Sequence, residues 1–105
     1  MHAQGKPSIN IQYVQMPTSD SMSAIVTSKL EKLANKYDWI IKADVFFKLE
    51  NDPSGSGKIC EIRLSAPGPR LFAKSNQDNF EKAAATTIKE LENQLKKRKE
   101  IFKKY

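Results

Sequence analysis

The C-terminal third of the chain carries one long amphipathic pattern, and this pattern limits the possible folds more than any other feature. Between residues 80 and 102, apolar or small side chains recur mostly at three- and four-residue intervals, at Phe80, Ala84, Thr87, Ile88, Leu91, Leu95 and Phe102. At about 100° per residue these positions share one face of an α-helix. Such a helix buries its apolar face against another layer of secondary structure. The upstream chain must therefore supply that layer.

Four upstream segments show the two-residue alternation of half-buried strands. Their inward positions are Ile9, Ile11 and Tyr13, then Ala43, Val45, Phe47 and Leu49, then Cys60, Ile62 and Leu64, and finally Leu71, Ala73 and Ser75. The predicted strands are residues 8–15, 41–50, 58–65 and 70–75. The Gly- and Ser-rich stretch 51–57 predicts a hairpin loop, and Ala-Pro-Gly-Pro at 66–69 predicts a type II turn.

A first helix is predicted over residues 20–37, where apolar side chains also recur at helical spacing. Ser19 is its expected N-cap, and Asn76 or Asp78 is the expected cap of the second helix. The element order β-α-β-β-β-α predicts an α+β two-layer sandwich, with two helices on one face of a four-stranded, mostly antiparallel sheet. We expect residues 1–8 to be a flexible lead-in and residues 9–105 to form a single domain.

Basic residues are concentrated in the same C-terminal helix. The last ten residues have a net charge of +5, whereas the whole chain has +6. Lysines spaced by seven line a second stripe of that helix, at Lys82, Lys89, Lys96 and Lys103. Three more lysines share an edge of the first helix, namely Lys29, Lys32 and Lys36. One or two lysines near a helix C-terminus complement the helix dipole by about 0.3–1 kcal/mol, which does not account for a whole row. The row indicates a polyanionic partner, and a membrane surface is the less favoured anion.

Residues for catalysis are scarce. His2 is the only histidine and Cys60 the only cysteine, so the domain offers neither a nucleophile–histidine pair nor a zinc cluster. Gly55-Ser56-Gly57-Lys58 lacks the spacing of a phosphate-binding loop, and Ile59 stands where that loop needs Ser or Thr. We expect Cys60 to be a small core side chain. No enzyme activity, metal or cofactor is therefore expected, and the single cysteine and polar start favour a cytoplasmic protein.

The outward positions of the predicted strands combine aromatic and basic side chains, namely Phe46, Lys48, Arg63, Phe72 and Lys74. Such a surface can stack on nucleic-acid bases. The simpler interpretation is that Phe46 and Phe72 pair with each other across strands, and the sequence favours it.

Three stretches resemble the bacterial family of ribosome hibernation-promoting factors and ribosome-associated inhibitors. They are residues 26–33 followed by Tyr37-Asp38, residues 71–75, and Asp78-Asn79-Phe80 leading to residues 94–99 (QLKKRK). The similarity covers nearly the whole chain. Two positions depart from the family pattern, since Phe80 replaces the usual tyrosine and Ala84 replaces a frequent second acid.

This resemblance implies a non-catalytic protein that sits in the cleft of the small ribosomal subunit, blocks messenger and transfer RNA binding, and silences translation in stress or stationary phase. The chain is similar to the short form that stops at the second helix, so we expect a monomer off the ribosome, with no membrane and no small-molecule substrate. The predicted contacts to ribosomal RNA phosphates are Lys29, Lys32, Lys36, Lys74, Lys82, Lys89, Lys96, Lys97, Arg98 and Lys99.

Two other binding functions fit the same charge pattern. A general double-stranded RNA-binding module also places helices on one face of a small sheet. A protein-interaction domain with an acidic partner would use the same basic tail. The sequence does not distinguish pairing of ribosomes from holding them as inactive single ribosomes.

Overall fold

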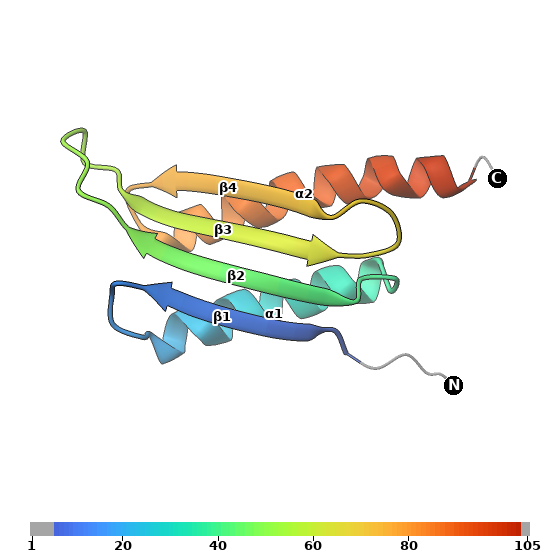
Figure 1. Ribbon diagram of the computed structural model, residues 1–105, viewed down its shortest axis with the longest axis horizontal. Helices are drawn as coiled ribbons and strands as arrows, with labels where there is room; N and C mark the ends of the chain where they lie inside the picture. The colour runs from blue at the N-terminus through green and yellow to red at the C-terminus, as the bar shows by residue number, and fades with distance from the viewer. Residues whose placement is uncertain (1–5, 104–105) are drawn as a thin grey trace.

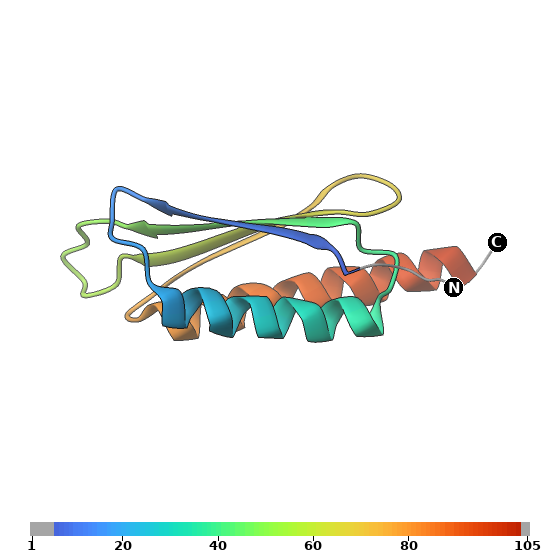
Figure 2. The ribbon, with the colours of Figure 1, turned by 90° about the horizontal axis from the view of Figure 1, so that it is seen from below.

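The computed structural model describes residues 6–103 and has the predicted element order β-α-β-β-β-α (Figure 1). Four strands form one sheet, and both helices cover the same face of it, so the other face is open (Figures 1 and 2). The fold is therefore the predicted α+β two-layer sandwich. The elements are β1 (Ser8–Val14), α1 (Asp20–Lys36), β2 (Lys42–Leu49), β3 (Lys58–Ser65), β4 (Leu71–Gln77) and α2 (Phe80–Lys103).

The sheet has the strand order β1-β2-β3-β4 and is mixed. β1 runs parallel to β2 because α1 carries the chain back to the starting end between them. The pairs β2–β3 and β3–β4 are antiparallel and are joined by short connections. In this register Val45 lies between Ile11 and Ile62, and Ala73 follows Ile62 on β4. The inward apolar positions of all four strands therefore form one layer.

The core lies between that layer and the two helices. Val45, Phe47 and Ile62 of the sheet are fully buried, as are Leu91 and Leu95 of α2. The apolar face predicted for α2 is thus confirmed along the sheet. Further on, Phe102 is 41% exposed and its ring packs edge-on against Trp39, with 5.1 Å between ring centroids. The last turns of α2 extend past the end of α1 (Figure 2).

Buried polar groups within the core are paired. Thr87 is fully buried, and its hydroxyl donates a hydrogen bond of 3.0 Å to the carbonyl oxygen of Cys60. The Cys60 side chain is itself fully buried, and burial raises the pKa of its thiol to about 12. Cys60 is therefore a core side chain, as the sequence predicted, and not a reactive thiol.

The helix caps follow the prediction at one helix only. The Ser19 side chain accepts a hydrogen bond from the backbone N–H of Met22, which confirms it as the N-cap of α1. The prediction for α2 was wrong, because Asn79 accepts the bond from the backbone N–H of Lys82 at 2.7 Å. An N-cap directly precedes the first helical residue, and only Asn79 has that position.

The two rejected capping residues have other roles. The Asn76 side chain accepts a hydrogen bond from the backbone N–H of Gly57, which holds the β2–β3 loop against β4. Asp78 forms an ion pair with Lys82. In the β3–β4 turn, Gly68 has a φ of +96°, as the third position of a type II turn requires.

Of the predicted lead-in, residues 1–5 lie outside the described part of the chain, and β1 begins at Ser8. Within residues 6–103, neither helix has an apolar stretch long enough to cross a bilayer.

Candidate nucleic-acid interface

The two helices run side by side in the same direction over the sheet (Figure 2). A groove of about 350 Å³ lies between them. α1 contributes Lys29, Lys32, Leu33 and Lys36 to its lining, and α2 contributes Ala85, Ile88, Lys89 and Glu92. The structure thus brings together four lysines that the sequence predicted as RNA contacts on separate helices.

Helical periodicity explains why lysines form the walls of this groove. On α1, Leu30 and Leu33 are buried, and Lys29, Lys32 and Lys36 fall on the exposed edge beside them. On α2, Ile88 is half-buried between the helices and Lys89 follows it at the rim. Lysine stems pack along such an apolar floor while their ammonium groups stay in water. The groove therefore has an apolar floor and cationic walls.

One acidic side chain interrupts the cationic walls. The Lys36 ammonium group donates a 2.5 Å hydrogen bond to the Glu92 carboxylate across the groove. This bond, supported by the charges of Lys36, Lys96 and Lys89, lowers the pKa of Glu92 below its ordinary value. The same bond raises the pKa of Lys36. At neutral pH both groups are charged, and each is the ion-pair partner of the other.

The lysine-rich end of α2 forms a second basic area, next to the C-terminus of α1. Tyr37, Lys96, Lys97, Lys99 and Glu100 surround a shallow hollow of about 420 Å³ there. The Lys99 ammonium group lies 5.8 Å from the centroid of the Tyr37 ring, within the range of a cation–π contact. This area continues the basic surface along α2 beyond the groove.

Three other residues that were predicted to contact RNA are either bonded within the protein or lie on the other face of the sheet. The Arg98 guanidinium donates a hydrogen bond of 2.8 Å to the carbonyl of Pro67, so it braces the β3–β4 turn. Lys82 pairs with Asp78 at 3.1 Å within α2. Lys74 lies on β4 with its side chain on the open face of the sheet, opposite the helices. Contact with RNA stays a prediction for these three residues, as it does for the other seven. The side chain of Lys103, which continues the row of lysines, lies outside the described residues.

Ile88 was predicted on the apolar face of the second helix, whereas Ala85 and Glu92 were not singled out from the sequence, so the full lining of the groove was not predicted. Glu92 lies 56 residues from Lys36, so only the packing of the helices reveals their contact.

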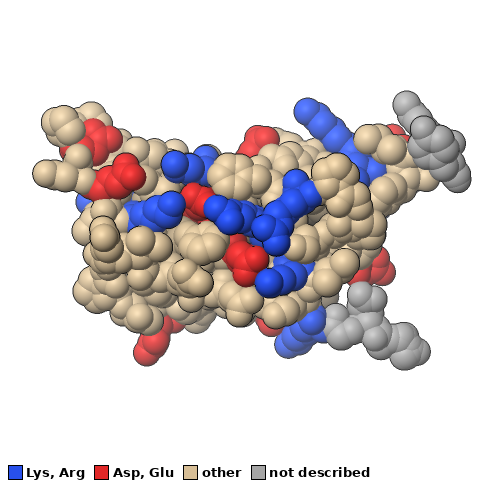
Figure 3. Space-filling model, in the orientation of Figure 1, with Lys and Arg blue, Asp and Glu red and all other residues tan. Residues whose placement is uncertain are grey.

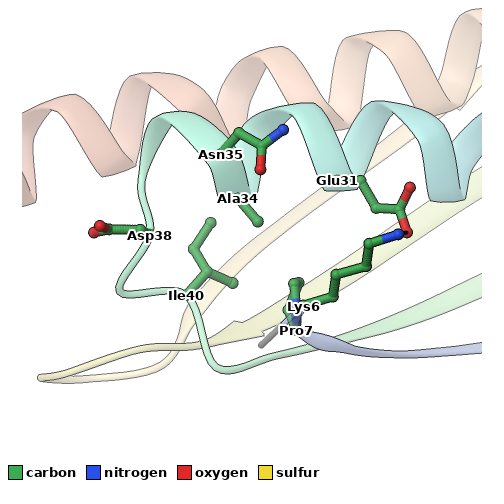
Figure 4. Close-up of a pocket in the computed structure, with 7 residues that line it drawn as sticks. All are labelled: Lys6, Pro7, Glu31, Ala34, Asn35, Asp38 and Ile40. Carbon is green, nitrogen blue, oxygen red and sulfur yellow. Dashed lines mark ion pairs between the residues drawn. The ribbon is translucent and has the colours of Figure 1, made fainter. Parts of the chain in front are cut away.

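Another cavity, of about 380 Å³, lies at the other edge of α1 (Figure 4). Its lining includes Lys6, Glu31, Asp38 and Ile40, and Lys6 pairs with Glu31 at 3.6 Å. One lysine and two acidic residues line it, so its net charge is negative and it does not suit a polyanion. Within the described chain, no three His, Cys, Asp or Glu side chains are close enough to hold a metal ion.

The open face of the sheet corrects one interpretation of the sequence. Phe46 lies on β2 and Phe72 on β4, and β3 separates the two strands. The two phenylalanines therefore do not pair with each other. Arg63 of β3 lies directly opposite Phe72, and its guanidinium carbon is 5.2 Å from the centroid of the Phe46 ring.

Comparison with known proteins agrees with the fold. Residues 9–103 match the protein family described as Sigma 54 modulation protein / S30EA ribosomal protein. A ribosomal subunit interface protein from Coxiella burnetii superposes with a TM-score of 0.78 at 22% identity, over 88% of this chain and 97% of that one. The N-terminal domain of Thermus thermophilus Protein Y gives 0.74 at 20% identity, over 87% and 97%. No curated protein matches the chain by sequence.

Proposed function

The chain belongs to the Sigma 54 modulation protein / S30EA ribosomal protein family, and from this and the lysine-walled groove we propose that it is a ribosome hibernation factor. In this proposal it binds in the cleft of the small ribosomal subunit in the cytoplasm. It occupies the place of messenger and transfer RNA and silences translation under stress or in stationary phase. It acts by occupancy, without catalytic turnover.

The observation that carries the proposal is the convergence of lysines from both helices on one surface. Within residues 6–103, six of these lysines form no ion pair within the protein: Lys29, Lys32, Lys89, Lys96, Lys97 and Lys99. Their charges are therefore available to phosphates. If each contacts one phosphate, log K should fall with log salt with a slope of about 4–5.

The shape of this surface favours folded RNA as the ligand. The groove between the two parallel helices has lysine side chains from both of them along an apolar floor. Phosphate contacts fix position and orientation and carry no sequence information directly. Specificity would then come from the shape of the cleft.

The proposal is tested by co-sedimentation with small subunits and intact ribosomes at several salt concentrations. The test variant combines Lys89→Gln, Lys96→Gln and Lys99→Gln, and the control combines Lys42→Gln, Lys58→Gln and Arg70→Gln, which removes the same charge away from the groove. We expect the test variant to bind more weakly, with a slope smaller by about 2–3, while the control binds like wild type. Equal binding by both variants would refute the assignment of the interface.

Competition separates this function from its alternatives. Messenger and transfer RNA should displace the protein from ribosomes, whereas free RNA duplexes should compete poorly. Equal competition by free duplexes would favour a general double-stranded RNA-binding module instead. A shift of ribosomes into a heavier gradient fraction would indicate that they are paired.

A further inference from the structure

The open face of the sheet carries a continuous band of aromatic and cationic groups. Phe46, Arg63 and Phe72 form its centre across β2, β3 and β4. The Arg63 guanidinium carbon lies over the Phe46 ring, 5.2 Å from its centroid, so these two residues form a cation–π contact. Figure 3 views this face and shows basic side chains across the middle of the sheet, with fewer acidic ones among them.

The acidic group at the centre of the band is already neutralised. Glu61 is buried, and its two carboxylate oxygens pair with Lys48 at 3.2 Å and with Arg63 at 3.1 Å. Lys74 lies opposite Glu61 on β4 and is exposed. Three cations thus surround one buried carboxylate, and the band has a net positive charge.

Phe72 is the most informative residue of the band. Its side chain is 47% exposed although it lies near the start of a strand in a well-paired sheet. The side-chain amide of Gln94 donates a hydrogen bond of 2.9 Å to its backbone carbonyl, which ties this part of the edge strand to α2. The backbone of Phe72 is therefore anchored, and its exposed side chain lies on the same face of the sheet as Arg63 and Lys74.

We propose that this face binds a single strand of RNA, with one base stacked on Phe72, a neighbouring base against the Arg63 guanidinium that lies over Phe46, and phosphates near Lys74 and Lys48. Aromatic rings on a sheet accept bases of any sequence because every base has a π-face, and adjacent cations follow the backbone. An acidic protein partner would satisfy the charges but would leave the exposed ring without a role. This site is separate from the helix groove, so the protein would hold folded RNA on one side and an unpaired strand on the other.

The experiment measures fluorescence anisotropy of a fluorescein-labelled, mixed-sequence 12-nucleotide RNA strand titrated with the full chain. Phe72→Ala should weaken binding about five-fold or more, as expected for the loss of one stacked base, and Phe72→Tyr should restore it. Leu49→Ala is the matched control, because Leu49 is an equally exposed apolar residue outside the band and its removal should change nothing. Lys74→Gln should reduce the salt slope by about 0.7.

Three results would overturn the site. They are no binding of the strand by the wild-type protein at micromolar concentration, equal binding by Phe72→Ala and wild type, and loss of strand binding in the variant lacking Lys89, Lys96 and Lys99. The last result would mean that the strand binds the helix groove. Ribosome co-sedimentation of Phe72→Ala is scored separately, so that this site and the proposed function can fail independently.

Discussion

Replacing Glu92 by glutamine should tighten binding to the small subunit. Glu92 is the one carboxylate in the lysine-walled groove, and its hydrogen bond with Lys36 occupies a cation that phosphate would otherwise contact. Glutamine keeps nearly the same shape and removes the negative charge. The substitution therefore changes the electrostatics of the groove more than its packing.

The size of the effect follows from Coulomb's law and counterion release. A carboxylate repels a phosphate about 6 Å away by ~0.7 kcal/mol in water, which corresponds to about three-fold in affinity. The freed Lys36 adds one available cation, so the salt slope should become steeper by about 0.7–0.9. We expect at least a three-fold gain at low salt, which shrinks as salt is raised.

The assay is the sedimentation titration repeated at four or more salt concentrations, with Glu90→Gln as the matched control. Glu90 lies on the same helix and accepts a hydrogen bond from Gln94, whose other contact is β4, so it belongs to the opposite edge of α2. Removing its charge alters net charge equally without changing the groove. Unchanged or weaker binding by Glu92→Gln, or an equal gain by Glu90→Gln, would show that phosphate does not enter this groove.

Three further predictions concern the folded state. Thr87→Val removes the buried hydrogen bond to the Cys60 carbonyl and should lower the free energy of unfolding by about 1 kcal/mol in urea titrations, whereas no change would mean that the carbonyl finds another donor. The Cys60 thiol, with a pKa of about 12, should react with a thiol reagent only after denaturation, and rapid labelling of the native protein would contradict its burial. Because the pKa of Glu92 is lowered from 4.5 and that of Lys36 is raised from 10.5, their pair stabilises the fold between about pH 5 and 10. The difference in stability between wild type and Glu92→Gln should therefore shrink as the pH falls below 4.5 and through the lowered pKa of Glu92, and a difference that does not change over this range would exclude this ionised pair as its source.

Most of the fold could be predicted because local signals agree with one another. The alternation in β3 and the helical spacing in α2 predict elements that the structure has at nearly the same residues. Element ends were less accurate: β4 runs to Gln77, two residues beyond the predicted strand. Its polar end, which includes Asn76, lacks an alternating apolar signal, yet it pairs with Lys58 and Ile59 of β3. Pairing with a neighbouring strand extends a strand where its own sequence does not.

The candidate site, like the fold, could be predicted only in part. Rows of lysines are visible in the sequence, because residues three, four or seven apart share a helix face. The structure adds what depends on contacts between distant segments. Arg98 is tied to the carbonyl of Pro67, Lys36 is tied to Glu92, and Phe72 is separated from Phe46 by a strand. None of these three arrangements produces a periodic pattern in the sequence.

The topology explains why the basic surface is concentrated at one end of the molecule. β1 and β4 run in the same direction, because β1 is parallel to β2 and two antiparallel steps separate β2 from β4. Each is followed by a helix that returns along the sheet, so α1 and α2 are parallel and their C-termini lie at the same end (Figure 2). The negative ends of two helix dipoles meet there, and one or two lysines on each would compensate them. Lys36 complements the dipole of α1, but α2 places Lys96, Lys97 and Lys99 within its last eight residues, which is more than its dipole requires. The excess charge, displayed on a helix that extends past its neighbour, is the part of this surface that structural stability does not explain and that the proposed RNA ligand would explain.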